Sequence, residues 1–193
     1  MARLIIPATL AQLMYSCTIR DKKDLRASLR NISARYDATA DTTTLVTTDT
    51  HRLAIATAQG KPIPAGVYAP SKPRTNDRFW ELEETQGQFP IPNWQRIVPP
   101  SENQVHIARA WYPTVSAGGI ITADGTQRLS VDLSFLQVLT DTKHDWWITQ
   151  ESGDLRRPYV ATHDVKGRNS WEWCEWTVKV VIMPCDLPSE SQW

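Results

Sequence analysis

Residues 43–58 constrain the fold more than any other part of this sequence, because their pattern predicts two strands joined by a tight turn. The first arm, Thr43–Thr47, is rich in β-branched residues, which favour strands. The second arm, Arg52–Thr57, alternates polar and apolar residues, as half-buried strands do. Asp49 and Thr50 between the arms supply turn chemistry. We therefore predict a β-hairpin, and with it a sheet.

The composition excludes several classes of protein. The 193 residues are enough for one large or two small domains. Lys plus Arg and Asp plus Glu both number 21, so the net charge is zero and there is no overall electrostatic case for nucleic-acid binding. No apolar run reaches the roughly 18 residues of a membrane helix. Cys17, Cys174 and Cys185 are widely spaced and odd in number, so we expect a cytoplasmic protein with no metal or other cofactor.

Short strands and one helix are predicted in the first half. Proline is tolerated in the first turn of a helix, so Pro7 marks a helix start. Leu10, Leu13 and Met14 follow it at helical spacing and predict its buried stripe. The expected elements are a strand at 3–6, a helix at 7–16, a mostly extended stretch at 25–36, the hairpin, and strands at 67–69 and 78–85.

The second half repeats this arrangement coarsely. Asp132 is a suitable N-cap for a helix, and a strand is predicted just before it. Both halves therefore follow a β-α-β-β-β order, and short helices with antiparallel sheets indicate the α+β class. The expected elements are strands at 104–107, 129–131, 146–150, 159–162 and 171–183, and helices at 108–116 and 132–139.

A proline-rich segment separates the halves. Residues 86–102 contain prolines 90, 92, 99 and 100, a density that favours an extended connector. We therefore expect one domain-like half at residues 1–85, a connector at 86–102, and a second half at 103–193.

Four segments together resemble the bacterial replicative sliding-clamp family, the β subunit of DNA polymerase III. Val46–Ala56 is similar to the family's ATDGHRLA signature. Gly87–Pro99 is similar to its G-x-F-P-[DN]-[YW]-x-R-[VI]-[LVI]-P stretch, with two extra residues after Pro90. Val180–Leu187 is similar to its terminal V-V-M-P-M-R-L, and Leu25–Asn31 to its R-x-x-L-N-G strand. The resemblance implies the sliding-clamp fold, with repeated β-α-β-β-β units, antiparallel sheets and few short helices.

The resemblance also implies a peptide-binding pocket. In that family these segments line one apolar cleft, which receives a short extended peptide from polymerases, the clamp loader and repair proteins. Such a peptide needs concave apolar subsites, and Arg52 and Arg96 would meet its carbonyls or an acidic residue. The pocket residues implied here are Leu29, Thr48, Thr50, His51, Arg52, Leu53, Pro90, Arg96, Ile97, Met183, Pro184, Cys185 and Leu187.

The chain departs from the family in several places. The family's glycine before the histidine is Thr50 here, which costs free energy if the turn needs a positive φ. Cys185-Asp186 replaces Met-Arg in the terminal motif. The family has three similar domains in about twice the length. A compact clamp, from a phage or mobile element, or a clamp-derived monomeric peptide-binding module is therefore expected.

DNA binding is expected from loops rather than from helices. Clamps form rings whose inner helices are basic, so that DNA slides without sequence readout. Residues 7–16 and 132–139 contain no Lys or Arg. A ring would need two or three copies. Expected partners are a polymerase or another replication or repair protein, double-stranded DNA, and a second copy of the chain, with no membrane. The DNA-contact candidates are Lys22, Lys23, Arg26, Arg30, Lys72 and Arg74.

Two other functions stay open at this stage. An enzyme would need a nucleophile with a base in reach, and no P-loop, G-x-S-x-G or paired-carboxylate motif is present, so we do not expect one. Residues 170–176 place Trp171 and Trp173 on one face of a predicted strand. If exposed, the two rings would stack on sugars or unpaired bases, as in a carbohydrate- or single-strand-binding domain.

Overall fold

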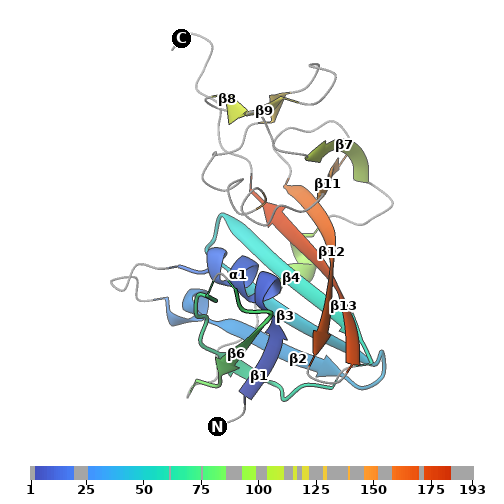
Figure 1. The fold of residues 1–193 in the computed structure, drawn as a ribbon. Coiled ribbons are helices and arrows are strands. Elements are labelled where there is room, and N and C mark those ends of the chain that lie inside the picture. Colours follow the sequence, from blue (N-terminus) through green and yellow to red (C-terminus); the bar gives the residue numbers. More distant parts are fainter. Residues whose placement is uncertain are drawn as a thin grey trace. The chain divides into compact units, whose positions relative to one another are not determined.

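The structure is a computed structural model, drawn as a ribbon in Figure 1. Contacts divide the chain into unit 1, Met1–Trp94 with Asp164–Val180, and unit 2, Gln95–His163 with Val181–Trp193. The halves expected at 1–85 and 103–193, joined by 86–102, stay a prediction. The residues described are 3–19, 26–60, 62–74, 76–85, 93–98, 104–110, 115–116, 119–121, 128–129, 139, 146–151, 158–169 and 172–183.

Unit 1 begins with strand β1 (Arg3–Pro7) and helix α1 (Ala8–Ser16), which confirms the strand and helix predicted there. Pro7 is the N-cap residue, with φ −54°, the value to which its ring confines it. The Cys17 N–H ends the helix by donating to carbonyls of its last turn. The buried residues of α1 are Ala8, Leu10, Ala11, Leu13, Met14 and Ser16.

Four antiparallel strands of unit 1 are hydrogen-bonded in the order β5-β2-β3-β4, as part of a longer sheet. They are β2 (Ile32–Asp37), β3 (Thr42–Thr48), β4 (Arg52–Gln59) and β5 (Gly66–Tyr68). The predicted hairpin is confirmed as β3 and β4. Since β1-α1-β2-β3-β4 follow one another, the first β-α-β-β-β unit is also confirmed.

The stretch predicted as mostly strand at 25–36 is wrong in its first part. Residues Ala27–Arg30 form a 3₁₀ helix, η1, and the strand begins only at Ile32. The Leu29 N–H donates to the Arg26 carbonyl at 3.0 Å, a local bond that closes this turn. A short apolar run does not distinguish these two conformations by its pattern.

Both faces of the β3–β4 hairpin are buried, although alternation predicted half-buried strands. On one face Leu45 pairs with Ala56, and on the other Val46 pairs with Ile55; all four are buried. In the view of Figure 1, α1 crosses in front of β3 and β4. Alanines at alternate positions of β4 leave room for another element to approach that face closely.

A two-stranded sheet completes the first part of unit 1. Strand β6 (Phe79–Glu83) pairs with β1, and Leu4 lies opposite Leu82 with both buried. On the other face Arg3 and Glu81 form an exposed ion pair at 2.9 Å. The segment after β6 then runs beside β5, because the Thr85 N–H donates to the Val67 carbonyl at 2.7 Å.

The remaining long strands are β7 (Gln104–Ala110), β11 (Trp146–Glu151), β12 (Tyr159–Asn169) and β13 (Glu172–Ile182). They follow β4 in the hydrogen-bonded order β13-β12-β11-β7. In unit 2 the indole N–H of Trp146 donates to the carbonyl of Leu139 at 3.1 Å. Both residues are buried there with Ile148 and Tyr159.

The helix predicted at 108–116 is wrong in its described residues. Ala108–Ala110 continue β7, and Val115–Ser116 form β8. Strand β7 pairs with β11 over its whole length, so sheet hydrogen bonds outweigh the local helical pattern. Residues 132–138 of the other predicted helix lie outside the described residues, and Leu139 is helical. Two further short strands are β9 (Gly119–Ile121) and β10 (Arg128–Leu129).

The class is α+β, as expected, because the described residues form antiparallel sheets and one α-helix of nine residues. In that part of the chain no helix has both the length and the apolar character needed to span a bilayer.

Candidate functional site

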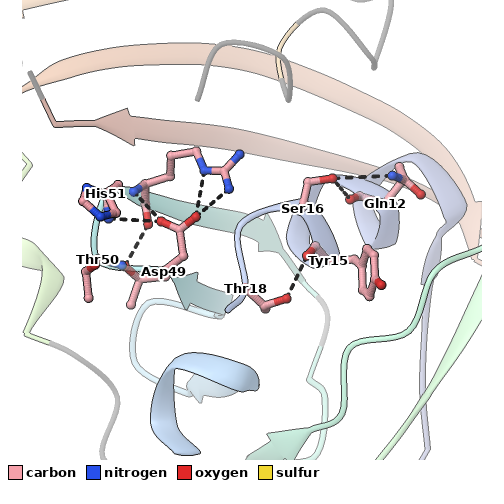
Figure 2. Close-up of polar contacts among 9 residues, drawn as sticks. Gln12, Tyr15, Ser16, Thr18, Asp49, Thr50 and His51 are labelled. Atoms are coloured by element: carbon pink, nitrogen blue, oxygen red, sulfur yellow. Dashed lines mark hydrogen bonds and ion pairs between the residues drawn. The ribbon is translucent and has the colours of Figure 1, made fainter. Parts of the chain in front are cut away.

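The turn between β3 and β4 is organised around one carboxylate. Asp49 Oδ1 accepts hydrogen bonds from the backbone N–H groups of His51 at 3.1 Å and Arg52 at 2.7 Å. Asp49 Oδ2 accepts from Nε of Arg52 at 2.9 Å and from Nη2 of the same side chain at 2.5 Å. Figure 2 shows these bonds converging on Asp49. The turn is therefore closed by a charged side-chain clamp as well as by the strand ladder.

The backbone of this turn is left-handed at Thr50, whose φ is +80°. The Thr50 N–H donates to Thr48 Oγ1 at 3.1 Å, and the Thr48 hydroxyl donates to the Arg52 carbonyl at 2.8 Å. A β-branched residue rarely adopts a positive φ. The turn does need the conformation that the family's glycine favours, so Thr50 carries a conformational cost.

Exposure separates the residues predicted to bind a peptide here. Thr50 and His51 are exposed, while Leu53 is buried in the core. The side chains of Asp49 and Arg52 are only 10% and 15% exposed. Arg52 is thus bound to Asp49, and the turn presents mainly Thr50 and His51 to solvent.

The other predicted pocket residue of unit 1, Leu29, lies in η1. It is half-buried, and its carbonyl accepts a hydrogen bond from the Ile19 N–H at 2.9 Å. This bond ties η1 to the chain just after α1.

Unit 2 exposes two of the predicted apolar residues. Ile97 is 40% exposed beside η2 (Trp94–Arg96), and Met183 is 38% exposed at the end of β13. Arg96 is also exposed. The 3₁₀ turn at η2 differs from the extended connector predicted for this segment. Four predicted pocket residues lie outside the described residues: Pro90, Pro184, Cys185 and Leu187.

The candidate DNA contacts of unit 1 are mostly on loops. Arg26, Lys72 and Arg74 are exposed, whereas Arg30 is half-buried. The Arg74 N–H donates to Asp77 Oδ2 at 3.0 Å, and the Asp77 N–H donates to the Arg74 carbonyl at 3.1 Å, so this basic loop has a defined turn. Lys22 and Lys23 lie outside the described residues.

The site residues predicted from the sequence did not include one exposed aromatic residue, Trp147. Trp147 is 53% exposed on β11, while Trp146 and Trp176 are buried. Because neighbouring side chains of a strand point to opposite faces, the Trp146-Trp147 pair in a predicted strand was the available signal. The candidate stacking residue Trp171 and the side chain of Trp173 lie outside the described part of the chain.

The described side chains include no group of three or more His, Cys, Asp or Glu residues able to hold a metal ion. The pKa of Tyr36 is raised, first by its hydrogen bond to Asp41 at 2.6 Å, then by burial and by the negative charges of Asp41 and Asp37. This tyrosine lies at the β2–β3 turn, away from the turn at Thr50 along the chain.

Solved structures of sliding clamps share this fold. The DNA polymerase sliding clamp from Pseudomonas aeruginosa with a ligand matches at a TM-score of 0.53 and 14% identity, over 96% of this chain and 66% of that one. DNA polymerase III subunit beta from Borrelia burgdorferi, in complex with a natural product, matches at 0.55 and 10%, over 97% and 65%. The beta chain from Streptococcus pneumoniae matches at 0.51 and 12%, over 97% and 65%.

No protein-family model and no curated protein sequence matches the chain. The chain spans just under two thirds of the length of these solved clamps. At such low sequence identity the similarity shows the fold alone.

Proposed function

We propose that this chain, whose fold is that of the DNA polymerase sliding clamps, is a non-catalytic processivity factor of the cytoplasm that docks partner proteins through a short peptide. The observation that carries the proposal is the fold match, which covers 96–97% of the chain. The proposed ligand is the peptide of a DNA polymerase or of another replication or repair protein.

The exposed residues of the predicted site support peptide docking. Ile97 and Met183 expose large apolar side chains, and each stands in a segment that resembles a peptide-contacting segment of the clamps. Buried apolar anchors dominate the affinity of peptide interfaces, and methionine adapts to different anchors. In unit 1 the proposed contacts are Thr50 and His51 at the tip of the turn.

A labelled peptide with a glutamine, a leucine and a Leu-Phe pair tests docking by fluorescence anisotropy. We expect micromolar binding that Met183→Lys and Ile97→Lys each weaken about tenfold or more, since each would leave a charge in an apolar contact. Ile5→Lys is the matched control, because Ile5 is 43% exposed on β1 and outside the proposed site. No binding at high micromolar peptide contradicts docking.

We further propose that the chain assembles as a ring-forming homo-oligomer around double-stranded DNA. The helix α1 has no charged residue, so the proposed phosphate contacts are the exposed loop residues Arg26, Lys72 and Arg74. Counterion release makes such binding fall steeply with salt. Mass measurement at tens of micromolar protein tests assembly: a monomer there would leave a clamp-derived peptide-binding module instead of a ring.

Trp147, 53% exposed on β11, is the described tryptophan that offers a ring face for the alternative of a carbohydrate- or single-strand-binding domain. Trp146 and Trp176 are buried, so neither offers a ring face for stacking. Quenching of indole fluorescence by iodide tests this: extensive quenching would support the alternative.

A further inference from the structure

Asp49 is not among the pocket residues that the clamp resemblance implies, but its carboxylate organises the turn that presents two of them. We infer that Asp49 is a positioning residue for docking, which holds Thr50 in its left-handed conformation and thereby sets how the turn presents His51. The inference rests on the proposed peptide docking at this turn.

Thr50 needs an external restraint to keep its backbone conformation. Its φ of +80° is a region in which a β-branched side chain clashes with its own backbone. Such a conformation persists only where the surrounding structure determines it. The restraint must come from the bonds that close the turn.

Thr48 Oγ1 accepts from the Thr50 N–H and donates to the Arg52 carbonyl. The Asp49 carboxylate supplies the remaining side-chain bonds of the turn. Its two oxygens accept from two backbone N–H groups and from two nitrogens of Arg52. The side chains of Asp49 and Arg52 are only 10% and 15% exposed and so are largely shielded from water. Charge-assisted hydrogen bonds are stronger in such a shielded place than at the surface. Arg52 therefore acts through Asp49, as part of the clamp, and its charge is neutralised within the turn.

The β2–β3 turn provides an internal control for the role of Asp49. At the β2–β3 turn, Asp37 Oδ1 accepts from the N–H groups two and three residues ahead, those of Thr39 at 2.9 Å and Ala40 at 3.2 Å. This is the arrangement that Asp49 makes with His51 and Arg52. Asp37, however, is exposed and lies in a turn outside the proposed docking residues.

The test compares peptide affinity among five proteins: wild type, Asp49→Ala, Thr50→Gly, the double variant Asp49→Ala with Thr50→Gly, and Asp37→Ala. We expect Asp49→Ala to weaken binding about tenfold, as loss of a preorganised contact does. The double variant should bind within about twofold of Thr50→Gly alone, because glycine adopts a positive φ without a restraint. Asp37→Ala should bind as wild type does.

A conformational measurement accompanies the affinities. In the unliganded full chain, a positive φ at residue 50 brings its N–H and Hα close, which gives a strong intraresidue NOE. We expect this signal in wild type and its loss in Asp49→Ala. The double variant is compared by affinity alone, because glycine has two α-hydrogens and one of them lies near its N–H at either sign of φ. If Asp49→Ala fails to fold, Asp49→Asn repeats the comparison, because its amide oxygen still accepts from the backbone while its NH₂ faces Arg52.

Two results overturn the inference. One is unchanged affinity in Asp49→Ala. The other is a double variant about tenfold weaker than Thr50→Gly, which would make Asp49 itself a peptide contact. A wild-type protein that binds no peptide overturns the proposed docking, and the positioning role in docking falls with it. The NOE then still decides whether Asp49 holds the turn.

Discussion

The two turns that flank β3 are closed by the same aspartate hydrogen bonds, but within the described part of the chain only one of them has an additional ion pair. In each, an aspartate accepts hydrogen bonds from the N–H groups two and three residues ahead. Each turn also contains a non-glycine residue with a positive φ, Asp41 at 48° and Thr50 at 80°. Aspartate tolerates this conformation better than a β-branched residue does. The turn with the less suitable residue is the one with the additional clamp.

The two turns also differ in how far their charged side chains are exposed to water. Asp37 and Asp41 are exposed, and Asp41 bonds to the Tyr36 hydroxyl at 2.6 Å. Asp49 and Arg52 are shielded and doubly bonded to each other. Backbone strain at Thr50 is therefore held by partly buried charge, which is the arrangement expected where a loop must keep one shape for a ligand.

The largest expected effect is a difference in the free energy of unfolding between variants of Asp49 and Asp37. Asp49→Ala should lower the free energy of unfolding by about 2–3 kcal/mol, because it leaves the Arg52 guanidinium shielded without its carboxylate. Asp37→Ala should cost about 1 kcal/mol or less, as loss of an exposed cap does. Urea denaturation followed by circular dichroism measures both. Equal losses would mean that the clamp adds nothing beyond the shared hydrogen bonds.

The next effect concerns the left-handed residues. Thr50→Gly should raise the free energy of unfolding by about 0.5–1 kcal/mol, because relief of the strained φ outweighs the greater freedom of glycine in the unfolded chain. Asp41→Gly should change it by less, since aspartate already tolerates the conformation. Thermal unfolding of the two variants ranks them, and a larger gain at Asp41 would reverse the comparison.

The smallest effect is a pH dependence at the exposed turn. The pKa of Tyr36 is raised from 10.0, so its neutral hydroxyl stabilises the fold below the unfolded pKa, and this contribution is lost as pH rises through the folded pKa. Ultraviolet titration of tyrosinate should show Tyr36 and Tyr68 titrating late, since the pKa of each is raised. Asp41→Asn should shift only the Tyr36 titration toward lower pH. An unchanged titration curve in Asp41→Asn would mean that Asp41 does not perturb Tyr36.

Local chemistry explains which predictions succeeded. The hairpin and the helix after Pro7 depend on neighbours in the chain: a turn-forming aspartate, a proline with a fixed φ, and apolar residues at helical spacing. The prediction for 108–116 was wrong because pairing with β11 determines the conformation of Ala108–Ala110. No pattern within a few residues contains that information.

The candidate site divides in the same way. The sequence alone determined that a polar turn stands at residues 48–52 and that Thr50 would be costly if its φ were positive. Only the tertiary structure decided that φ is +80°, that Arg52 is bound to Asp49, and that Leu53 is buried while Ile97 and Met183 are exposed. The reason is physical: adjacent residues specify that a turn forms, whereas burial depends on residues brought together from distant parts of the chain, and burial decides which local contacts of the turn are shielded and kept.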